Sequence, residues 1–256
     1  ITITPFTGLI YNSLSQELAT YSVSTSPDMG YEVTLTINSE TVTSLEKTNA
    51  GTYNIVVSLI GANYNEVSKG VSVTIAKFNL GNANVSQIVD QTYTGSEIKP
   101  EPTLTFLNPN NDTITIEQTN FGYTYTNNIN VGTAQVTITA KPDSTNFTGA
   151  RTVNFKIIHQ LLDATVEVTG TTTYGETLTA SYTVNNTGAT FTTTWQYKDG
   201  TNWVNVVDNT QVQLLLTAEG TNLTTVAGKE FRYLLQATGN FSGSAYSLPS
   251  GNIARK

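Results

Sequence analysis

The sequence predicts an all-β protein built from three tandem immunoglobulin-like β-sandwich domains in an extended arrangement. Three observations support this prediction. Apolar and polar residues alternate in many short runs, turn-forming residues separate the runs, and a set of landmarks recurs about 80 residues along the chain. Alternation with a period of two places one face of a strand in a core and the other in water. No segment carries a helical period of useful length, which favours a sandwich.

The recurring landmarks are three, and they keep their order. Tyr11 recurs as Tyr93, and an Asn-x-Gly-Thr turn begins at Asn49 and again at Asn130. An Asn-aromatic pair at residues 63–64 recurs at residues 146–147. The offsets of 82, 81 and 83 residues agree closely. A period of this length is too long for a solenoid repeat and fits a small sandwich domain.

A third segment shows weaker similarity to the first two. It has Tyr-Gly at residues 174–175 and Gly-Asn-Phe-Ser-Gly at residues 239–243. We therefore predict three domains, which we call repeat 1 (residues 1–79), repeat 2 (residues 80–160) and repeat 3 (residues 161–256). The two joins are short and partly apolar rather than rich in Pro, Gly or Ser, which favours repeats packed against their neighbours.

Several single residues have predicted structural roles in these repeats. Gly51 and Gly132 are expected to supply a positive φ in the turn before a core strand. Trp195 lies in the middle of an alternating run, where a sandwich core takes one large aromatic side chain. Asp199 and Gly200 suit a tight turn that returns the chain to Trp203.

Composition excludes several classes of partner and site. Charged residues make up 12% of the chain and the net charge is −7, which argues against nucleic acid as a partner. No apolar run reaches the length of a membrane span, so we expect no membrane insertion. The absence of cysteine excludes disulfides and thiolate metal sites and favours a bacterial or engineered source. Any targeting segment is expected outside this sequence.

The motifs themselves resemble a known family. The motifs that carry the resemblance are Tyr-Asn-Ser-Leu-Ser-Gln-Glu-Leu at residues 11–18, the segments 49–53, 63–65 and 71–77, and the aromatic run at 121–128. Repeats 1 and 2 thereby resemble the bacterial MBG-type and related immunoglobulin-like repeats of large surface proteins of Firmicutes, Mollicutes and their relatives. Repeat 3 is similar to another bacterial immunoglobulin-like module through residues 175–180, 195–200 and 228–233, together with Trp203. The resemblance implies a fold and an extracellular setting, cell-surface or secreted, and it carries no catalytic signature.

No arrangement of residues predicts catalysis. The one histidine, His159, falls at a predicted join, where a solvated or packing role is expected rather than a place in a Ser-His-Asp triad. Residues 143–145 (Asp-Ser-Thr) lack the Gly of an aspartic-protease triplet. Glu97 and Glu101 stay open as a glycosidase pair, although they stand beside prolines on an expected edge. We therefore expect a protein that is not an enzyme and needs no cofactor.

Metal and crosslink sites are also not predicted. Residues 108, 110 and 112 have the alternate spacing of a calcium loop, but the Gly and Glu required at its sixth and twelfth positions are absent, so a turn is expected. Calcium at the joins stays open because Asp90 and Asp163 lie near them. Lys156 is a formal candidate for an intramolecular crosslink, but alternation places it on the solvent face.

Exposed aromatic side chains are the candidate binding residues. We predict Trp203, near a hairpin, and Tyr197 as binding residues. Exposed aromatic rings of this kind can stack on sugar rings. Phe121, Tyr123 and Tyr125 share one face of a strand, and we expect them to be packed rather than free.

These observations predict a non-catalytic stalk segment of a bacterial adhesin-like protein that spaces or presents a distal domain. Its first partners are the neighbouring modules of the same larger protein. The alternative is an accessory module that binds a glycan or a host surface protein, and this module could belong to a secreted glycoside hydrolase.

Overall fold

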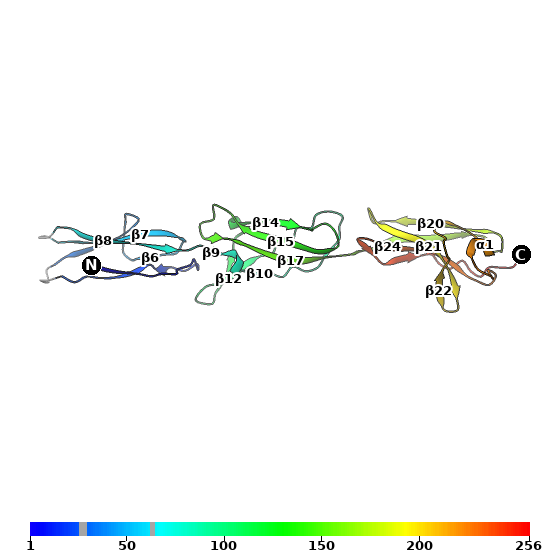
Figure 1. Ribbon diagram of the computed structural model, residues 1–256, viewed down its shortest axis with the longest axis horizontal. Helices are drawn as coiled ribbons and strands as arrows, with labels where there is room; N and C mark the ends of the chain where they lie inside the picture. The colour runs from blue at the N-terminus through cyan, green and yellow to red at the C-terminus, as the bar shows by residue number, and fades with distance from the viewer. Residues whose placement is uncertain (26–29, 62–64) are drawn as a thin grey trace. The chain divides into compact units, whose positions relative to one another are not determined.

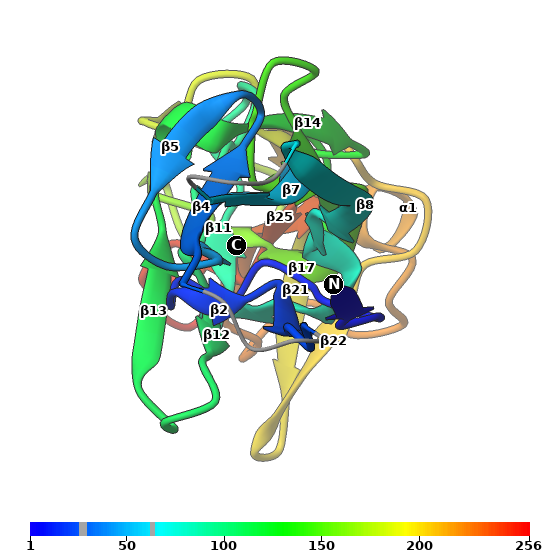
Figure 2. The same cartoon turned by 90° about the vertical axis from the view of Figure 1, so that its left-hand side faces the viewer.

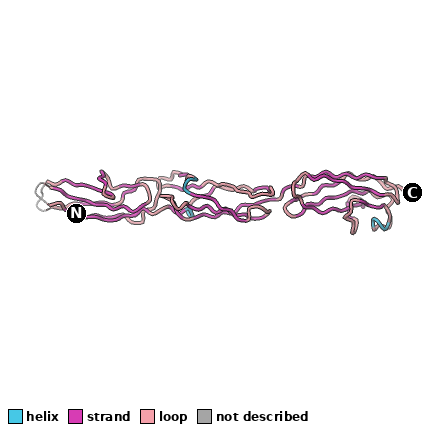
Figure 3. Tube along the Cα trace, turned by 90° about the horizontal axis from the view of Figure 1, so that it is seen from above, coloured by secondary structure: helices cyan, strands magenta, loops and turns pink. Residues whose placement is uncertain are grey.

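The computed structural model describes residues 1–25, 30–61 and 65–256, and within them the protein is all-β. Figure 3 shows strands and loops throughout, with helical structure confined to short turns. These turns are η1 (Leu80–Asn82), η2 (Gln118–Asn120) and α1 (Ala218–Thr221). The prediction of an all-β chain is confirmed. No helix among the described residues is long and apolar enough to cross a membrane.

The chain is organised in two compact units. Unit 1 contains Ile1–Ile88, Pro100–Thr126 and Gln135–Asn154, and unit 2 contains Val89–Lys99, Asn127–Ala134 and Phe155–Lys256. The division falls within repeat 2, so residues of this repeat belong to both units. The division into three sandwich domains, their borders and their extended arrangement therefore stay predictions.

Repeat 1 is built from one four-stranded sheet and two small ladders. The sheet has the order β5-β4-β7-β8, and its strands lie side by side in Figure 2. Its strands are β5 (Glu40–Val42), β4 (Glu32–Ile37), β7 (Gly51–Ile60) and β8 (Val67–Ile75). The ladders pair β1 (Thr2–Pro5) with β3 (Ala19–Ser22) and β2 (Gln16–Glu17) with β6 (Glu46–Lys47).

The core of repeat 1 follows the alternation of its strands. Ile55 and Val57 of β7 are buried, as are Val73 and Ile75 of β8, whereas Thr74 between the last two faces water. Leu18, between β2 and β3, has no exposed surface and joins the same cluster. One face of the four-stranded sheet is therefore covered by the small ladders, as period-two patterning predicts.

Repeat 2 contains a three-stranded and a four-stranded sheet. The first has the order β10 (Asn84–Val85), β12 (Leu104–Leu107), β13 (Thr113–Ile116). The second has the order β11 (Gln91–Thr92), β17 (Ala150–Ile158), β15 (Gly132–Ala140), β14 (Phe121–Thr126). Alternate residues are again buried, among them Leu104 and Phe106 on β12 and Val136 and Ile138 on β15.

Repeat 3 lies wholly in unit 2 and also contains two larger sheets. The three-stranded sheet has the order β19 (Ala164–Gly170), β20 (Thr177–Val184), β23 (Gln213–Leu215). The four-stranded sheet has the order β22 (Asn202–Asn205), β21 (Thr190–Asp199), β24 (Phe231–Thr238), β26 (Ser244–Tyr246). The predicted turn at Asp199 and Gly200 is confirmed, because it closes the β21–β22 hairpin that projects beyond β24 in Figure 1.

Trp195 occupies the centre of the core of repeat 3, as predicted. It has no exposed surface, and its ring meets that of Tyr233 edge-on at 5.1 Å between centroids. Its indole Nε1 donates a hydrogen bond to the carbonyl oxygen of Gln211 at 2.9 Å. The one polar group of the side chain is therefore satisfied inside the core, as burial of an indole requires.

Two parallel ladders occupy the segments between repeats. β9 (Phe78–Asn79) pairs with β16 (Phe147–Thr148), and β18 (Gln160–Leu161) pairs with β25 (Phe241–Ser242). Each therefore joins the chain that leaves one repeat to a loop of the next. The turn-forming pair Pro27-Asp28 and the Asn-aromatic pair at residues 63–64 lie outside the described residues.

Replacing Trp195 by Ala should destabilise the core of repeat 3 by about 3 to 5 kcal/mol, because a large buried side chain is removed and the carbonyl of Gln211 loses its donor. Urea unfolding followed by circular dichroism measures the change. Thr192→Ala, at an exposed position of the same strand, is the matched control and should change stability by less than about 0.5 kcal/mol. Equal effects of the two substitutions would contradict this account of the core.

Candidate functional site

The Asn-aromatic motif forms a tight loop in repeat 2 and again in repeat 3. In repeat 2 it covers residues 146–149 and connects β15 to β17, and in repeat 3 it covers residues 240–243 and connects β24 to β26. The motif ends in Gly149 or Gly243, whose φ angles are 75° and 86°. Glycine is favoured in this left-handed region, because other side chains are strained there.

In unit 1, this loop of repeat 2 binds the turn that precedes β7 of repeat 1. The Asn146 side-chain oxygen accepts a hydrogen bond from the backbone N–H of Ala50 at 2.8 Å. Its amide nitrogen donates to the side-chain oxygen of Asn49 at 3.1 Å. One side chain therefore satisfies a backbone donor and a side-chain acceptor of the Asn-x-Gly-Thr turn 96 residues away. We call this contact clasp 1.

In unit 2, the same contact forms between repeat 3 and repeat 2. The Asn240 side-chain oxygen accepts from the backbone N–H of Val131 at 3.0 Å, and its amide nitrogen donates to the side-chain oxygen of Asn130 at 3.0 Å. We call this contact clasp 2. The two landmarks that recur in the sequence are thus the two halves of one contact, with the turn on one repeat and the loop on the next.

Backbone pairing reinforces both clasps. The carbonyl oxygen of Asn146 accepts from the N–H of Phe78 at 2.9 Å, and that of Asn240 accepts from the N–H of Gln160 at 3.2 Å. These bonds belong to the parallel ladders β9–β16 and β18–β25. The same Asn residue therefore holds the preceding repeat through its side chain and the connecting segment through its main chain.

An edge-to-face aromatic pair completes each clasp. Tyr11 meets Phe147 with ring centroids 5.4 Å apart at 78°, and Tyr93 meets Phe241 at 5.5 Å and 81°. This geometry aims the positive edge of one ring at the negative face of the other. The third recurring landmark, the tyrosine, is therefore the partner of the aromatic residue in the Asn-aromatic motif.

Clasp 1 has additional contacts at positions where clasp 2 differs in sequence. Phe78 stacks on Phe106 at 4.6 Å, and Lys77 Nζ donates to the carbonyl oxygen of Ser144 at 2.6 Å. The equivalent positions 82 residues later are Gln160 and His159. His159 is exposed, at the end of β17. Clasp 1 is thus more apolar and has one more charged donor.

Repeat 3 contributes a loop to clasp 2 but has no corresponding turn. The sequence from 161 to 256 contains no Asn-x-Gly-Thr. Before β24 the chain runs through Gly228 and Lys229 instead, and the N–H of Gly228 donates to the carbonyl oxygen of Ile253 within the repeat. This turn is therefore bonded to a segment of its own repeat.

Each repeat also pairs a segment near its start with its end in parallel. The backbone N–H of Tyr11 donates to the carbonyl oxygen of Ala76 at 2.8 Å, and that of Tyr93 donates to the carbonyl oxygen of Ile158 at 2.9 Å. The N–H of Tyr174 donates to Ala254 at 3.0 Å. In a parallel pair of a first and a last strand, the N-terminal and C-terminal ends of the repeat lie at opposite ends of the ladder. A force applied to these two ends therefore loads the hydrogen bonds of the ladder together, in shear.

The two predicted binding residues, Trp203 and Tyr197, lie on opposite faces of the sheet in repeat 3. Trp203 pairs across the hairpin with Lys198, and Tyr197 pairs with Val204, so their side chains point in opposite directions. Tyr197 packs against the core, with Lys229 Nζ 5.4 Å above its ring. The structure does not bring the two residues together.

Trp203 instead belongs to an outer face that sequence reasoning missed. The guanidinium carbon of Arg232 lies 4.3 Å from the centroid of the Trp203 ring and 4.4 Å from that of Tyr246. Arg232 Nε donates to the Gln196 side-chain oxygen at 2.8 Å, and burial lowers the pKa of Arg232 below its usual value. Phe231 and Tyr233 alternate as core residues in the sequence. Arg232 lies between them, and this pattern could have placed it on the outer face.

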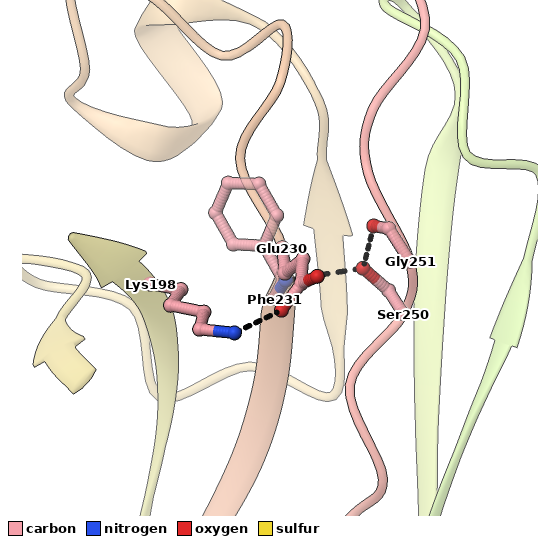
Figure 4. A network of polar contacts seen from close by, with 5 residues as sticks. All are labelled: Lys198, Glu230, Phe231, Ser250 and Gly251. Atoms are coloured by element: carbon pink, nitrogen blue, oxygen red, sulfur yellow. Dashed lines mark hydrogen bonds and ion pairs between the residues drawn. The ribbon is translucent and has the colours of Figure 1, made fainter. Parts of the chain in front are cut away.

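Neighbouring charged groups on this sheet are paired with one another. Lys198 Nζ lies 3.1 Å from a carboxylate oxygen of Glu230, as Figure 4 shows. The same view shows Ser250 Oγ accepting from the N–H of Phe231 and donating to the carbonyl oxygen of Gly251, which fixes the C-terminal segment beside β24. Lys229 pairs with Asp199 at 2.8 Å.

The aromatic run of β14 is packed, as expected. Phe121 is buried, and Tyr123 and Tyr125 donate their hydroxyl groups to the carbonyl oxygens of Pro102 and Pro100 at 2.8 and 2.9 Å. Burial raises the pKa of both tyrosines above the usual value, and the negative charge of Glu101 adds to this. These rings cover the proline segment and do not form a free platform.

The remaining candidates occupy turns and surfaces. Asn108 accepts from the N–H groups of Asn110 and Asp112 and donates to the Asp112 carboxylate at 3.0 Å, which makes the segment a closed turn between β12 and β13. Lys156 is exposed on β17, as alternation predicted. Glu97 pairs with Lys99 at 2.6 Å, and Glu101 accepts from Gln118.

No protein-family model matches the chain, and no curated protein matches it. Solved structures that it resembles include two from adhesion proteins. One is a tetra-tandem repeat in the extending region of a large adhesion protein (14% identity, 98% of this chain and 74% of that chain, TM-score 0.38). Another is a 1.5-MDa bacterial ice-binding adhesin (14% identity, 99% and 96%, TM-score 0.27).

A third similar structure is a Bacteroides ovatus protein, SGBP-B of a mixed-linkage glucan utilization locus, in complex with a mixed-linkage heptasaccharide. It is 12% identical, with 96% of this chain and 67% of that chain covered and a TM-score of 0.24. At these identities the likeness concerns the all-β fold alone. The assignment to MBG-type repeats stays a prediction.

Replacing Asn146 by Ala should open clasp 1, because the N–H of Ala50 loses its acceptor. We expect amide hydrogen exchange at Ala50 to accelerate roughly 5- to 30-fold, while exchange at Val131 stays unchanged. Asn240→Ala should give the reverse pattern, so each variant controls the other. Asn154→Ala, at an exposed position on β17, should leave both amides protected. Unchanged exchange at Ala50 in Asn146→Ala would contradict the clasp.

The tyrosine of clasp 1 should make unit 1 sensitive to alkali. Burial raises the pKa of Tyr11 above its usual value of about 10. The neutral form is therefore favoured in the folded state, and its contribution to stability is present below about pH 10 and is lost as the pH rises through the folded pKa. Urea unfolding between pH 8 and pH 12 should show a smaller loss in Tyr11→Phe than in the unsubstituted protein. The same loss in both would rule out this role.

Proposed function

We propose that the chain is a non-catalytic spacer segment of a bacterial surface or secreted adhesin-like protein, in which the repeats hold a distal domain at a distance. The observation that carries this proposal is the repetition of one clasp in two places. A spacer needs a joint that each added repeat can reuse, and clasps 1 and 2 use the same residue types in the same roles.

The chemistry of the clasp suits a joint outside the cell. The contacts that the two clasps share are neutral amide hydrogen bonds and an aromatic edge-to-face pair, so salt screens them little. Each joint also includes backbone bonds of the connecting segment, which limits the freedom of a short linker.

The parallel pairing near the ends of each repeat supports a role under tension. A force applied through the chain ends loads bonds such as Tyr11 N–H to Ala76 and Tyr93 N–H to Ile158 in shear rather than one at a time. Several bonds must then break together before a repeat unfolds. A segment that connects a cell to a bound target experiences this kind of load.

Single-molecule stretching of the whole chain from its two ends tests the proposal. We expect three unfolding steps, each unfolding a repeat whose extended chain measures roughly 260 to 350 Å, since an extended residue spans about 3.3 to 3.6 Å. A smooth extension without steps, or a single step for the whole chain, would overturn the proposal.

The variant Ala76→Pro removes the N–H that donates to Leu9 in repeat 1. It should lower the force of one step and leave the other two unchanged, so the remaining repeats serve as the internal control. A uniform fall of all three forces would indicate a different source of mechanical resistance.

A further inference from the structure

The outer face of the four-stranded sheet in repeat 3 carries a guanidinium between two aromatic rings. Arg232 lies within 4.4 Å of the ring centroids of both Trp203 and Tyr246. Tyr246 is 56% exposed, on β26, which borders the sheet. Trp203 comes from β22 at the opposite border, so the stack extends across the sheet. We call these three residues, with Gln196 and Asn205, the Arg232 platform.

The orientation of Arg232 is fixed from one side only. Its Nε donates to Gln196, whose amide nitrogen in turn donates to the Asn205 side-chain oxygen at 2.9 Å. Gln196 is 8% exposed, so this amide chain is held firmly in the sheet. The two terminal nitrogens of the guanidinium are the part of the fork that carboxylates bind in pairs.

The charge of Arg232 has no counterion among the described residues. No ion pair there includes it, and Glu230, which directly precedes β24, is paired with Lys198. The acid at the end of β21, Asp199, is paired with Lys229. In a chain with a net charge of −7, a positively charged group without an ion-pair partner, between the half-buried ring of Trp203 and the exposed ring of Tyr246, fits an anionic ligand.

We propose that the Arg232 platform binds a carboxylate-bearing glycan. The guanidinium fork would take a sugar carboxylate, and the exposed ring of Tyr246 would stack on the C–H face of an adjacent sugar in the chain. The exposed amide of Asn205 offers further hydrogen-bond groups for sugar hydroxyls. A flat, aromatic and polar sheet face suits a sugar chain better than a peptide, because a peptide takes its affinity from a groove or a sheet edge.

This site is independent of the spacer role, because none of its residues belongs to a clasp. Asn240→Ala should therefore leave glycan binding unchanged. Loss of binding in Arg232 variants would likewise leave the unfolding steps in the stretching experiment unaffected.

Titration of the whole chain with acidic oligosaccharides tests the proposal. The probes are galacturonate oligomers, hyaluronan oligomers and sialyllactose, each compared with the same sugar after methyl esterification of its carboxylates. We expect at least one acidic probe to bind about tenfold more tightly than its ester, with a change in the NMR signal of Trp203 Nε1–H. Absence of binding to every acidic probe, or equal binding of acid and ester, would overturn the proposal.

Two variants and one control assign the binding to this face. Arg232→Lys keeps the charge but loses the planar fork, and should weaken the acidic probe about tenfold. Arg151→Lys is the matched control in repeat 2, where Arg151 donates to the carbonyl oxygen of Gly81, and should have no effect. If Arg232→Lys does not fold, the affinity of Tyr246→Ala, on the border strand, is measured instead. We expect its affinity for the acidic probe to fall about fivefold. Unchanged affinity in the folded variant used would refute the site.

A poly-glutamate peptide is the last comparison. It offers carboxylates without sugar rings, and we expect it to bind at least tenfold more weakly than the acidic glycan. Equal binding of the peptide would overturn the proposal in favour of simple charge attraction.

Discussion

A backbone N–H that the turn before a core strand cannot satisfy by itself organises the joints of this protein. At Ala50 and Val131 that donor is satisfied by an asparagine of the following repeat. The asparagine must both accept from the backbone and donate to a second asparagine on the turn. An aspartate could only accept, and would place a carboxylate against the side-chain oxygen of Asn49 or Asn130. The amide is therefore the side chain whose two ends match the two ends of the turn.

The surface of the sheets is made polar without charge. Threonine pairs face one another across strands, as in Thr52 with Thr74 on β7 and β8 and Thr137 with Thr152 on β15 and β17. Cross-strand threonines hydrogen-bond while their methyl groups pack, which suits a sheet with one wet face. The low charge content of the chain follows from this solution, and the joints inherit it. Stability that depends on neutral contacts is little affected by ionic strength.

Repeat 3 departs from the other two in the turn before β24 and on its surface. It supplies the asparagine of clasp 2 but closes its own turn through Gly228 and Ile253. Its core is centred on Trp195 and Tyr233, and its outer face carries the Arg232 platform. The all-β architecture thus supports two kinds of feature. The clasps use a motif that recurs along the chain, whereas the Arg232 platform uses residues that have no counterpart in the recurring landmarks. Divergence in sequence coincides here with a concentration of cation, amide and aromatic groups.

The sequence by itself determined the strands, because period-two alternation at Ile55, Val136 and Trp195 corresponds directly to burial. It also identified the tyrosine, the Asn-x-Gly-Thr turn and the Asn-aromatic pair as recurring units, but only as landmarks. That they contact one another across repeats was decided by tertiary structure, because the two halves of a clasp lie 96 or more residues apart and no local pattern encodes their pairing. The same holds for Trp203, which alternation separates from Tyr197 and which only strand order brings to Arg232 and Tyr246.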